Sequence, residues 1–319
     1  MEGELFFMKV VSVINYKGGV GKTTLTANLG AYAALKGYKV LLIDLDPQTS
    51  LTFSFMLPEH WEKFYADGKT LKDFFMPIIK KSPLPSLSSL VIHLHRECLP
   101  DFNNIHMDLI SSHLGLIDID IQLSSGLTGT TKMSLAANHL EAISHLTRAF
   151  EEVRNVYDLV LIDCPPNFSL TVKNALRASD YYIVPTKLDY LSTLGTRYIK
   201  KSIKDYEKEC LEYVADLGKG NNIPFSMKML GVVPMMVDIY RGETPIKVQE
   251  EYLSQLRSEY HVFQFVRNNS SLFGVAPKNG KLVIPAVLTH PKLSLTAYRI
   301  VNEIKQLGDE FLSALKEKS

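Results

Sequence analysis

The apolar residues of this chain form short runs rich in β-branched side chains, and these runs alternate with segments of helical spacing. Short continuous apolar runs are typical of buried strands in a parallel sheet. The runs predicted as strands are residues 8–14, 40–46, 157–163 and 229–234. Residues 22–36 have a helical apolar period, and Gly37 is a suitable residue to follow the end of a helix. A later helical stripe, predicted to pack on the core, consists of Leu295, Tyr298, Val301, Ile304, Leu307, Phe311 and Leu315.

The segment between the first strand and the first helix, residues 15–24, reads N-Y-K-G-G-V-G-K-T-T and is predicted to bind phosphate. A common phosphate-binding loop reads G-x-x-x-x-G-K-[ST]. Its backbone N–H groups surround the phosphates, its lysine reaches β- and γ-phosphate oxygens, and its hydroxyl binds Mg²⁺. Tyr16 stands where that pattern has its first glycine, and a second lysine, Lys17, directly precedes the glycine pair. The helix that follows adds orphan N–H groups and a dipole that favour an anion.

Acidic residues end two of the predicted strands. Asp44 and Asp46 end the second strand, in D-L-D-P-Q, and Asp163 ends the third, in I-D-C-P-P. Ligands of an open parallel sheet lie beyond the carboxyl ends of its strands, so we expect the three carboxylates to converge on the phosphates. Each acid alone could equally cap a helix or lie in a solvated loop. Their common register with the loop favours a site for a metal and phosphate.

Composition limits the classes of protein that fit. The 319 residues are 46% hydrophobic and contain no Pro/Gly/Ser-rich linker, which predicts a single domain over residues 1–319, with 1–7 as an N-terminal extension. A formal net charge of +1 means that any contact with nucleic acid needs a local basic patch. The three cysteines, Cys98, Cys164 and Cys210, are far apart. Their spacing argues against a disulfide framework, a zinc site or a bridged iron–sulfur cluster, and it fits a reducing cytoplasm. No apolar run approaches about 20 residues and no signal-peptide pattern is present, so we expect no membrane insertion.

The sequence K-G-G-x-G-K-[ST]-[ST] at residues 17–24 resembles the deviant Walker A loop of the ParA/MinD superfamily of dimerising ATPases. The D-x-D-P-Q and I-D-x-P-P sequences resemble the superfamily's switch I and its Walker B/switch II. The resemblance implies an α/β fold of the P-loop NTPase type, in which a doubly wound, mostly parallel sheet has helices on both faces. It also implies ATP and Mg²⁺ as cofactors and an ATP-dependent homodimer.

The same resemblance assigns roles to individual residues. It implies catalytic roles for Lys17, Lys22 and Asp46, with Lys17 acting in the other subunit's site and Asp46 positioning the attacking water. For Mg²⁺ it implies that Thr23 is a ligand, that Asp163 holds the hydration shell, and that Asp44 supports the site from behind these groups. The implied ATP-binding residues are Lys17, Gly18, Gly19, Val20, Gly21, Lys22, Thr23, Thr24 and Pro234.

The resemblance continues beyond switch II. Residues 167–176 look like the switch II helix, residues 180–185 like the next strand, and residues 229–234 like a strand whose end lies near the adenine. Residues 276–281 keep the superfamily's A-P-x-x-G-K sequence, whereas residues 267–270 read R-N-N-S in place of its usual I-P-R-N.

Residues 51–108 match the superfamily least. We expect a local helical insertion there, with a cargo- or adaptor-specific docking surface as the alternative reading. The aromatic residues expected to be buried in this segment are Trp61, Phe64, Phe74 and Phe75.

ParA-like relatives bind DNA non-specifically as ATP dimers, and MinD-like relatives bind membrane through a basic C-terminal helix. Here residues 305–319 carry Asp309, Glu310 and Glu317 among the lysines, which is not the pattern of a basic membrane helix. Basic residues at helical spacing that can share one face are Arg197, Lys200, Lys201, Lys204 and Lys208. Arg257 falls where the superfamily carries a DNA-contacting residue. The candidate DNA-binding residues are Arg257, Lys200, Lys201 and Lys204, with an ordinary solvated face as the alternative.

These features predict a ParA/Soj-type partitioning ATPase. The ATP-bound dimer is expected to bind duplex DNA without sequence preference, and a ParB-like centromere-binding or adaptor protein is expected to stimulate slow hydrolysis and release. We therefore expect a cytoplasmic protein that is nucleoid-associated when bound to ATP. The alternative is a superfamily member that positions a protein cargo or a division site. The cysteine positions disfavour an iron–sulfur reductase of the nitrogenase Fe-protein type.

Overall fold

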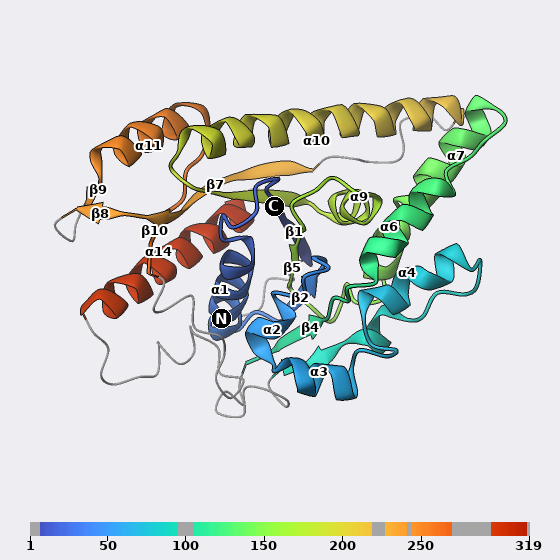
Figure 1. Ribbon diagram of the computed structural model, residues 1–319, viewed down its shortest axis with the longest axis horizontal. Helices are drawn as coiled ribbons and strands as arrows, with labels where there is room; N and C mark the ends of the chain where they lie inside the picture. Colours follow the sequence, from blue (N-terminus) through green and yellow to red (C-terminus); the bar gives the residue numbers. More distant parts are fainter. Residues whose placement is uncertain (1–6, 95–104, 219–226, 241–243, 270–294, 318–319) are drawn as a thin grey trace.

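The computed structural model describes residues 7–94, 105–218, 227–240, 244–269 and 295–317. An eight-stranded sheet with the order β10-β7-β6-β1-β5-β2-β4-β3 forms its centre (Figure 1). In this sheet β3 runs antiparallel to β4, and the other neighbours pair in parallel. The strands are β1 (Lys9–Val13), β2 (Val40–Asp44), β3 (Ile92–His93), β4 (Met107–Ile110), β5 (Leu159–Asp163), β6 (Tyr181–Thr186), β7 (Lys228–Val237) and β10 (Val266–Arg267). A separate two-stranded antiparallel ribbon pairs β8 (Ile239–Tyr240) with β9 (Thr244–Pro245).

Helices cover both faces of the sheet because successive strand residues point to opposite sides. Val11 and Leu42 face one side, in a core shared with α1 (Lys22–Leu35) and α14 (Leu295–Glu317), which lie side by side. Val10 and Leu41 face the other side. The helices packed there are α4 (Leu71–Ile79), α6 (Leu116–Ser125), α7 (Lys132–Ala142), α8 (His145–Phe150), α9 (Leu170–Ala178) and α10 (Tyr190–Asp216). The predicted doubly wound, mostly parallel α/β fold is therefore confirmed.

The described part of the segment that matched the superfamily least, residues 51–108, contains several short helices and also builds the edge of the sheet. It forms α2 (Thr52–Phe55), α3 (Pro58–Phe64), α4, the 3₁₀ helix η1 (Leu87–Leu90), β3 and the first residues of β4. The boundary at residue 108 thus cuts through β4, a strand that the sequence analysis did not predict. Phe74 and Phe75 are fully buried and Trp61 is partly buried, but the prediction for Phe64 was wrong, because its side chain is 53% exposed at the end of α3.

The C-terminal helix α14 packs on the core as predicted, and it contacts α1 there. Its buried stripe contains Val301, Ile304, Leu307, Phe311 and Leu315, and it also contains Ile300. Tyr298 was wrongly placed in the stripe, since it is 56% exposed on the opposite side from Ile300. Gly308 brings the two helices close: a Cβ atom there would stand 2.1 Å from the ring of Tyr32 on α1. Several predicted features, among them residues 1–6, Cys98, Ser270 and the A-P-x-x-G-K segment, lie outside the described residues.

Candidate active site

The phosphate loop lies between the end of β1 and the start of α1. Gly21 directly precedes α1 with φ 91°, in the left-handed region where glycine is favoured, and a Cβ atom there would also stand 3.1 Å from Cε of Met235. Gly18 is exposed, and no atom lies within 4 Å of where its Cβ would be. The loop therefore packs closely on β7 at Gly21 and leaves open space at Gly18, in front of the N terminus of α1.

A buried asparagine that the sequence analysis overlooked holds the loop in place. The side chain of Asn15 donates from Nδ2 to the carbonyl oxygen of Pro185 at 2.7 Å, and its Oδ1 accepts from the backbone N–H of Lys17 at 2.9 Å. Asn15 is fully buried, so these bonds are shielded from water. Its position at the end of an apolar strand was the available signal, because a polar group buried there requires partners.

Lys22 extends beneath the loop and is only 7% exposed. Its ammonium donates to the carbonyl oxygens of Asn15 at 3.2 Å and Lys17 at 3.4 Å. Burial lowers the pKa of Lys22, and the nearby carboxylates of Asp163 and Asp46 partly oppose that shift. Because the two carbonyls are neutral acceptors, an anion in the loop would relieve the cost of burying this charge.

Two acids stand side by side at the carboxyl ends of β2 and β5, where Asp44 pairs in register with Asp163. The hydroxyl of Thr23 on α1 donates to Oδ2 of Asp163 at 2.6 Å. Burial raises the pKa of Asp163 to about 7, despite hydrogen bonds and the attraction of Lys22. Burial, and then repulsion by Asp163, raises the pKa of Asp44 well above its usual range. A divalent cation would lower both pKa values, since it stabilises the ionised carboxylates.

Asp44 supports the loop that follows β2. Its Oδ2 accepts from the backbone N–H of Thr52 at 2.8 Å and from the Thr52 hydroxyl at 2.7 Å, while its Oδ1 accepts from the backbone N–H of Asp46 at 3.3 Å. Oδ1 of Asp44 therefore holds the D-x-D-P-Q segment at Asp46, and Oδ2 holds the start of α2 at Thr52. Asp46 is only partly buried, and its Oδ1 accepts from the backbone N–H of Gln48 at 3.0 Å.

The donor set fits Mg²⁺ bound together with phosphate. Among the described residues no group of three His, Cys, Asp or Glu side chains could hold a metal by itself. Mg²⁺ typically keeps several waters and uses one or two carboxylates together with substrate phosphates. The Thr23 hydroxyl and the Asp163 carboxylate are oxygen donors of that kind, at the edge of the loop.

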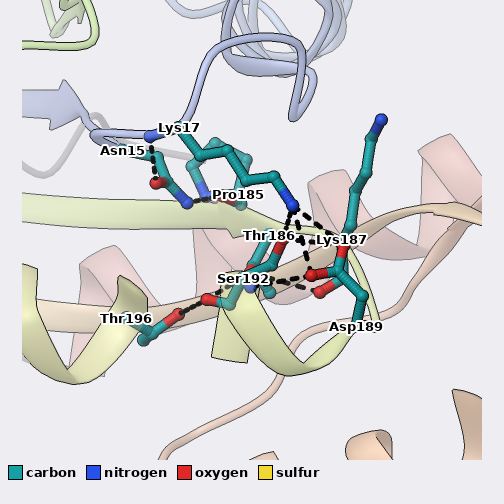
Figure 2. A network of polar contacts seen from close by, with 8 residues as sticks. All are labelled: Asn15, Lys17, Pro185, Thr186, Lys187, Asp189, Ser192 and Thr196. Carbon is teal, nitrogen blue, oxygen red and sulfur yellow. Dashed lines mark hydrogen bonds and ion pairs between the residues drawn. The ribbon is translucent and has the colours of Figure 1, made fainter. Parts of the chain in front are cut away.

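Lys17 extends from the loop to the start of α10 (Figure 2). Its ammonium lies 3.1 Å from Oδ2 of Asp189 and donates to the hydroxyl of Ser192 at 2.9 Å. Asp189 also caps α10, since it accepts from the backbone N–H of Ser192 at 2.8 Å. Burial alone would raise the pKa of Asp189, but the bonds from Ser192 and Lys17 outweigh it and lower the pKa. Asp189 and Ser192 were not predicted as partners of Lys17, and D-x-x-S at a helix start was the available local signal.

The strand that carries Pro234 is longer than predicted. The strand expected to end at residue 234 continues to Val237, so Pro234 is buried inside β7, opposite Thr186 of β6. The strand extends farther because β10 pairs alongside Met235 and Val237 and prolongs the sheet. Met235, the next residue, is the one that approaches Gly21 of the loop.

The candidate DNA-binding residues lie on α10 and on α11 (Lys247–Glu259), which contact each other. Arg197 forms an ion pair with Glu259, and the Lys200 ammonium lies 5.1 Å from the centre of the Tyr260 ring. The exposed candidates are Lys201, Lys204 and Arg257. The basic residues that were predicted to share one helix face therefore differ in their surroundings. Arg197 and Lys200 contact the α11 region, while Lys201 and Lys204 face solvent.

On this mostly parallel sheet, a strand–loop–helix phosphate site with an additional lysine before its glycine pair defines a P-loop NTPase of the deviant Walker A class. The sequence model of a family described as an AAA domain matches residues 8–215, and the chain belongs to that family. Within it, the chain is of the ParA/Soj type. It is 27% identical to the sporulation initiation inhibitor protein Soj of Bacillus subtilis over 285 residues, which cover 89% of this chain and 92% of Soj.

Two further comparisons bear on the extent of the likeness. An uncharacterised protein of Mycobacterium tuberculosis is 33% identical over 195 residues, or 61% of this chain, and the match spans only about half, 52%, of that relative's length. The structure of a McdA variant from Cyanothece, solved as a complex with ATP, has a TM-score of 0.65 at 19% identity and covers 97% of each chain. At this identity the likeness establishes the shared fold. No helix in the described part of the chain combines the length and apolar character that a membrane span requires.

Proposed function

We propose that this chain is an ATP-hydrolysing switch that binds duplex DNA as a nucleotide-dependent homodimer and leaves it when a partner protein stimulates hydrolysis. The hydrogen bond from Thr23 to Asp163, beside an open glycine loop, carries the proposal. It joins the hydroxyl and the carboxylate that a magnesium–phosphate site requires. The match to Soj over most of both chains supports the same function, as does the ATP in the McdA complex.

Each side chain of the site has a distinct task in this proposal. Lys22 contacts oxygens of the β- and γ-phosphates, and Thr23 binds Mg²⁺ through its hydroxyl. Asp163 accepts hydrogen bonds from the waters of the metal, and Asp46 orients the water that attacks the γ-phosphate. Asp44 keeps Asp46 in position through the backbone bond already described. Bound Mg²⁺ supplies positive charge to the phosphates as they separate.

Lys17 acts in the partner's site in this proposal. The loop already contains Lys22 as its own phosphate lysine, so a second cation has a separate purpose if it completes the site of another copy. In the single chain Lys17 binds Asp189 and Ser192, and the side chains of Lys17 and Asp189 are 39% and 43% exposed. Partly exposed ion pairs contribute little to stability, so this pairing can be exchanged for a phosphate contact at small cost.

DNA binding is assigned to exposed basic residues of α10 and α11, with Lys201, Lys204 and Arg257 as the direct contacts. A net charge of +1 gives no general attraction to DNA, so the contacts must be local and sensitive to salt. Lys200 supports this face through its contact with Tyr260. When ATP-bound, the protein is expected to associate with the nucleoid, and a ParB-like or adaptor protein is the expected partner.

The test combines nucleotide chemistry with a choice of surfaces. Thr23→Val removes the hydroxyl at constant shape, whereas Thr23→Ser retains it and serves as the matched control. Phosphate release with ATP and Mg²⁺ should be largely lost in Thr23→Val and largely kept in Thr23→Ser. Unchanged hydrolysis in Thr23→Val would exclude this loop as the active site. Co-sedimentation of ATP-loaded wild type with duplex DNA, and not with liposomes, is expected; binding to neither would favour the alternative of a protein cargo.

A further inference from the structure

Three aromatic rings connect the phosphate loop with the long helix α10. Tyr16, at the position where the common loop has glycine, packs edge-to-face on Phe168, with ring centroids 5.9 Å apart. Phe168 packs edge-to-face on Tyr206 of α10, with centroids 5.8 Å apart. Edge-to-face contact at these distances is favourable for aromatic pairs. We refer to Tyr16, Phe168 and Tyr206 as the ring stack.

Polar contacts fix the ring stack to its neighbours. The Tyr206 hydroxyl donates to the carbonyl oxygen of Lys173 on α9 at 2.9 Å. The Lys173 ammonium lies 5.3 Å from the centre of the Tyr206 ring and 6.0 Å from that of Phe168, where a cation is attracted to the ring. The middle of α10 is thus in contact with Phe168, which lies between β5 and α9, and with α9 itself, while Phe168 in turn contacts Tyr16 of the phosphate loop.

A stiff segment leads from the metal-site carboxylate to the ring stack. Phe168 follows Asp163 after C-P-P-N, and the two prolines restrict the backbone torsion φ. Pro166 and Asn167 are exposed, whereas Phe168 is packed against the core. The two prolines limit how far the backbone between Asp163 and Phe168 can absorb a displacement. A ligand that takes over the Thr23 hydroxyl would remove the hydrogen bond that Asp163 now accepts.

The far end of the ring stack lies beneath the basic residues of α10. Tyr206 is 3% exposed and belongs to the buried face of the helix, with Ile199 and Ile203. Lys201 and Lys204 are exposed within about one turn of Ser202 and Tyr206. A shift of the Tyr206 ring therefore moves the part of α10 that presents these two lysines.

We propose that the ring stack couples the state of the phosphate site to the position of the basic face of α10, with Tyr16 and Phe168 as positioning residues. The inference rests on the proposed function, because it names how one site regulates the other. With nucleotide bound, Asp163 and residues 164–167 fix the position of the Phe168 ring, and that ring fixes the position of the Tyr206 ring. The basic face of α10 then has one position with nucleotide and another without it, and Lys201 and Lys204 are presented to DNA phosphates in only one of these two positions.

The test uses an Asp46→Ala background, in which ATP hydrolysis is expected to be slow. Phe168→Leu and Tyr16→Gln each remove one ring, and Tyr16→Phe keeps the ring without the hydroxyl. The matched control is Tyr213→Leu, which removes a ring of α10 that stacks on His139 outside the ring stack. The measurements are ATP affinity, the gain in DNA affinity when ATP is added, and the ATP-dependent change in amide hydrogen exchange over residues 200–206 without DNA.

Phe168→Leu should keep ATP affinity within about threefold. At saturating ATP, Phe168→Leu and Tyr16→Gln should each reduce the ATP-dependent gain in DNA affinity by about two- to tenfold, the range for loss of an aromatic pair. The exchange response of residues 200–206 should shrink in parallel. The double variant should lose no more than one single variant, because the rings act in series. Tyr16→Phe and Tyr213→Leu should keep both responses.

Several results would overturn the coupling. An unchanged exchange response in Phe168→Leu would do so, and so would an equal loss in Tyr213→Leu. If the wild type binds ATP but no DNA, the DNA-binding part of the proposed function fails, while the exchange response still decides whether α10 is coupled. If the wild type binds no ATP, both the coupling and the proposed function fail.

Discussion

Replacing Asp163 with asparagine should stabilise the nucleotide-free protein at neutral and alkaline pH. Asp163 is 1% exposed, and burial raises its pKa to about 7 from an ordinary value of 3.8. In the folded protein the carboxyl group therefore holds its proton more tightly than in the unfolded chain. The contribution of Asp163 to the free energy of unfolding therefore falls as pH rises from about 4 to about 7, and it changes no further above that range. A difference of about three pKa units corresponds to about 4 kcal/mol.

The expected gain in the free energy of unfolding of Asp163→Asn is smaller than this limit. Asparagine has no charge and retains an oxygen acceptor for the Thr23 hydroxyl, but the variant loses the attraction between Asp163 and Lys22. We therefore expect Asp163→Asn to be more stable than the wild type by about 2–4 kcal/mol at pH 8, with the difference shrinking towards zero near pH 4. Urea unfolding without nucleotide or Mg²⁺, from pH 4.5 to 8.5, measures this difference. Asp205→Asn, which removes an exposed carboxylate of α10, is the control.

Two results would refute this reasoning about Asp163. One is equal stability of Asp163→Asn and wild type at pH 8, and the other is a stability difference that does not change with pH. Addition of ATP and Mg²⁺ should reverse the preference, since a divalent cation favours the ionised carboxylate. The nucleotide should then raise the melting temperature of the wild type more than that of the variant.

Three further predictions concern the proposed function. Asp46→Ala should bind ATP and dimerise while hydrolysis falls by about 10²–10⁴-fold, as is usual when a positioned acid–base group is lost; rapid phosphate release, or loss of nucleotide binding, would contradict its role. Lys17→Ala should bind ATP as a monomer, and its partner-stimulated hydrolysis should fall by about 10³-fold, the lower end for a cation supplied in trans. Light scattering measures dimerisation and a turnover assay measures hydrolysis, and full stimulated activity would exclude action across a dimer. Arg257→Glu should weaken ATP-dependent DNA binding and make it less dependent on salt concentration, with ATP affinity unchanged; an anisotropy titration at several salt concentrations that matches the wild type would remove Arg257 from the interface.

The sequence predicted the central strands and the phosphate loop well because each has a strong local pattern. β1, β2 and β5 are continuous apolar runs, and the glycine pair and Lys22 mark the start of α1. The carboxyl ends of parallel strands share one edge of the sheet, so the convergence of Asp44 and Asp163 could also be expected, although the direct pairing of β2 with β5 was not predicted.

Other parts depend on contacts that no local pattern contains. β4 has only four residues and β3 only two, too short for a strand period to be distinguished from a turn of helix. Asp189 meets Lys17 because β6 lies beside β1 and delivers the start of α10 to the loop. Tyr298 missed the core because the buried stripe of α14 is centred on Ile300 and Ile304, an offset that only the packing on α1 determines.

The central position of β1 also sets an order of events during synthesis of the chain. Its neighbours in the sheet are β5 and β6, which begin at Leu159 and Tyr181, so the strand that carries the phosphate loop has no native partner until the chain has grown by about 150 residues. At usual translation rates this takes roughly 8–30 seconds. The apolar face of α1 lacks its closest cover for even longer, because Gly308 of α14 packs on Tyr32. Until then the nascent N-terminal segment exposes apolar surface that the folded protein buries, and we expect chaperones to bind it during this interval.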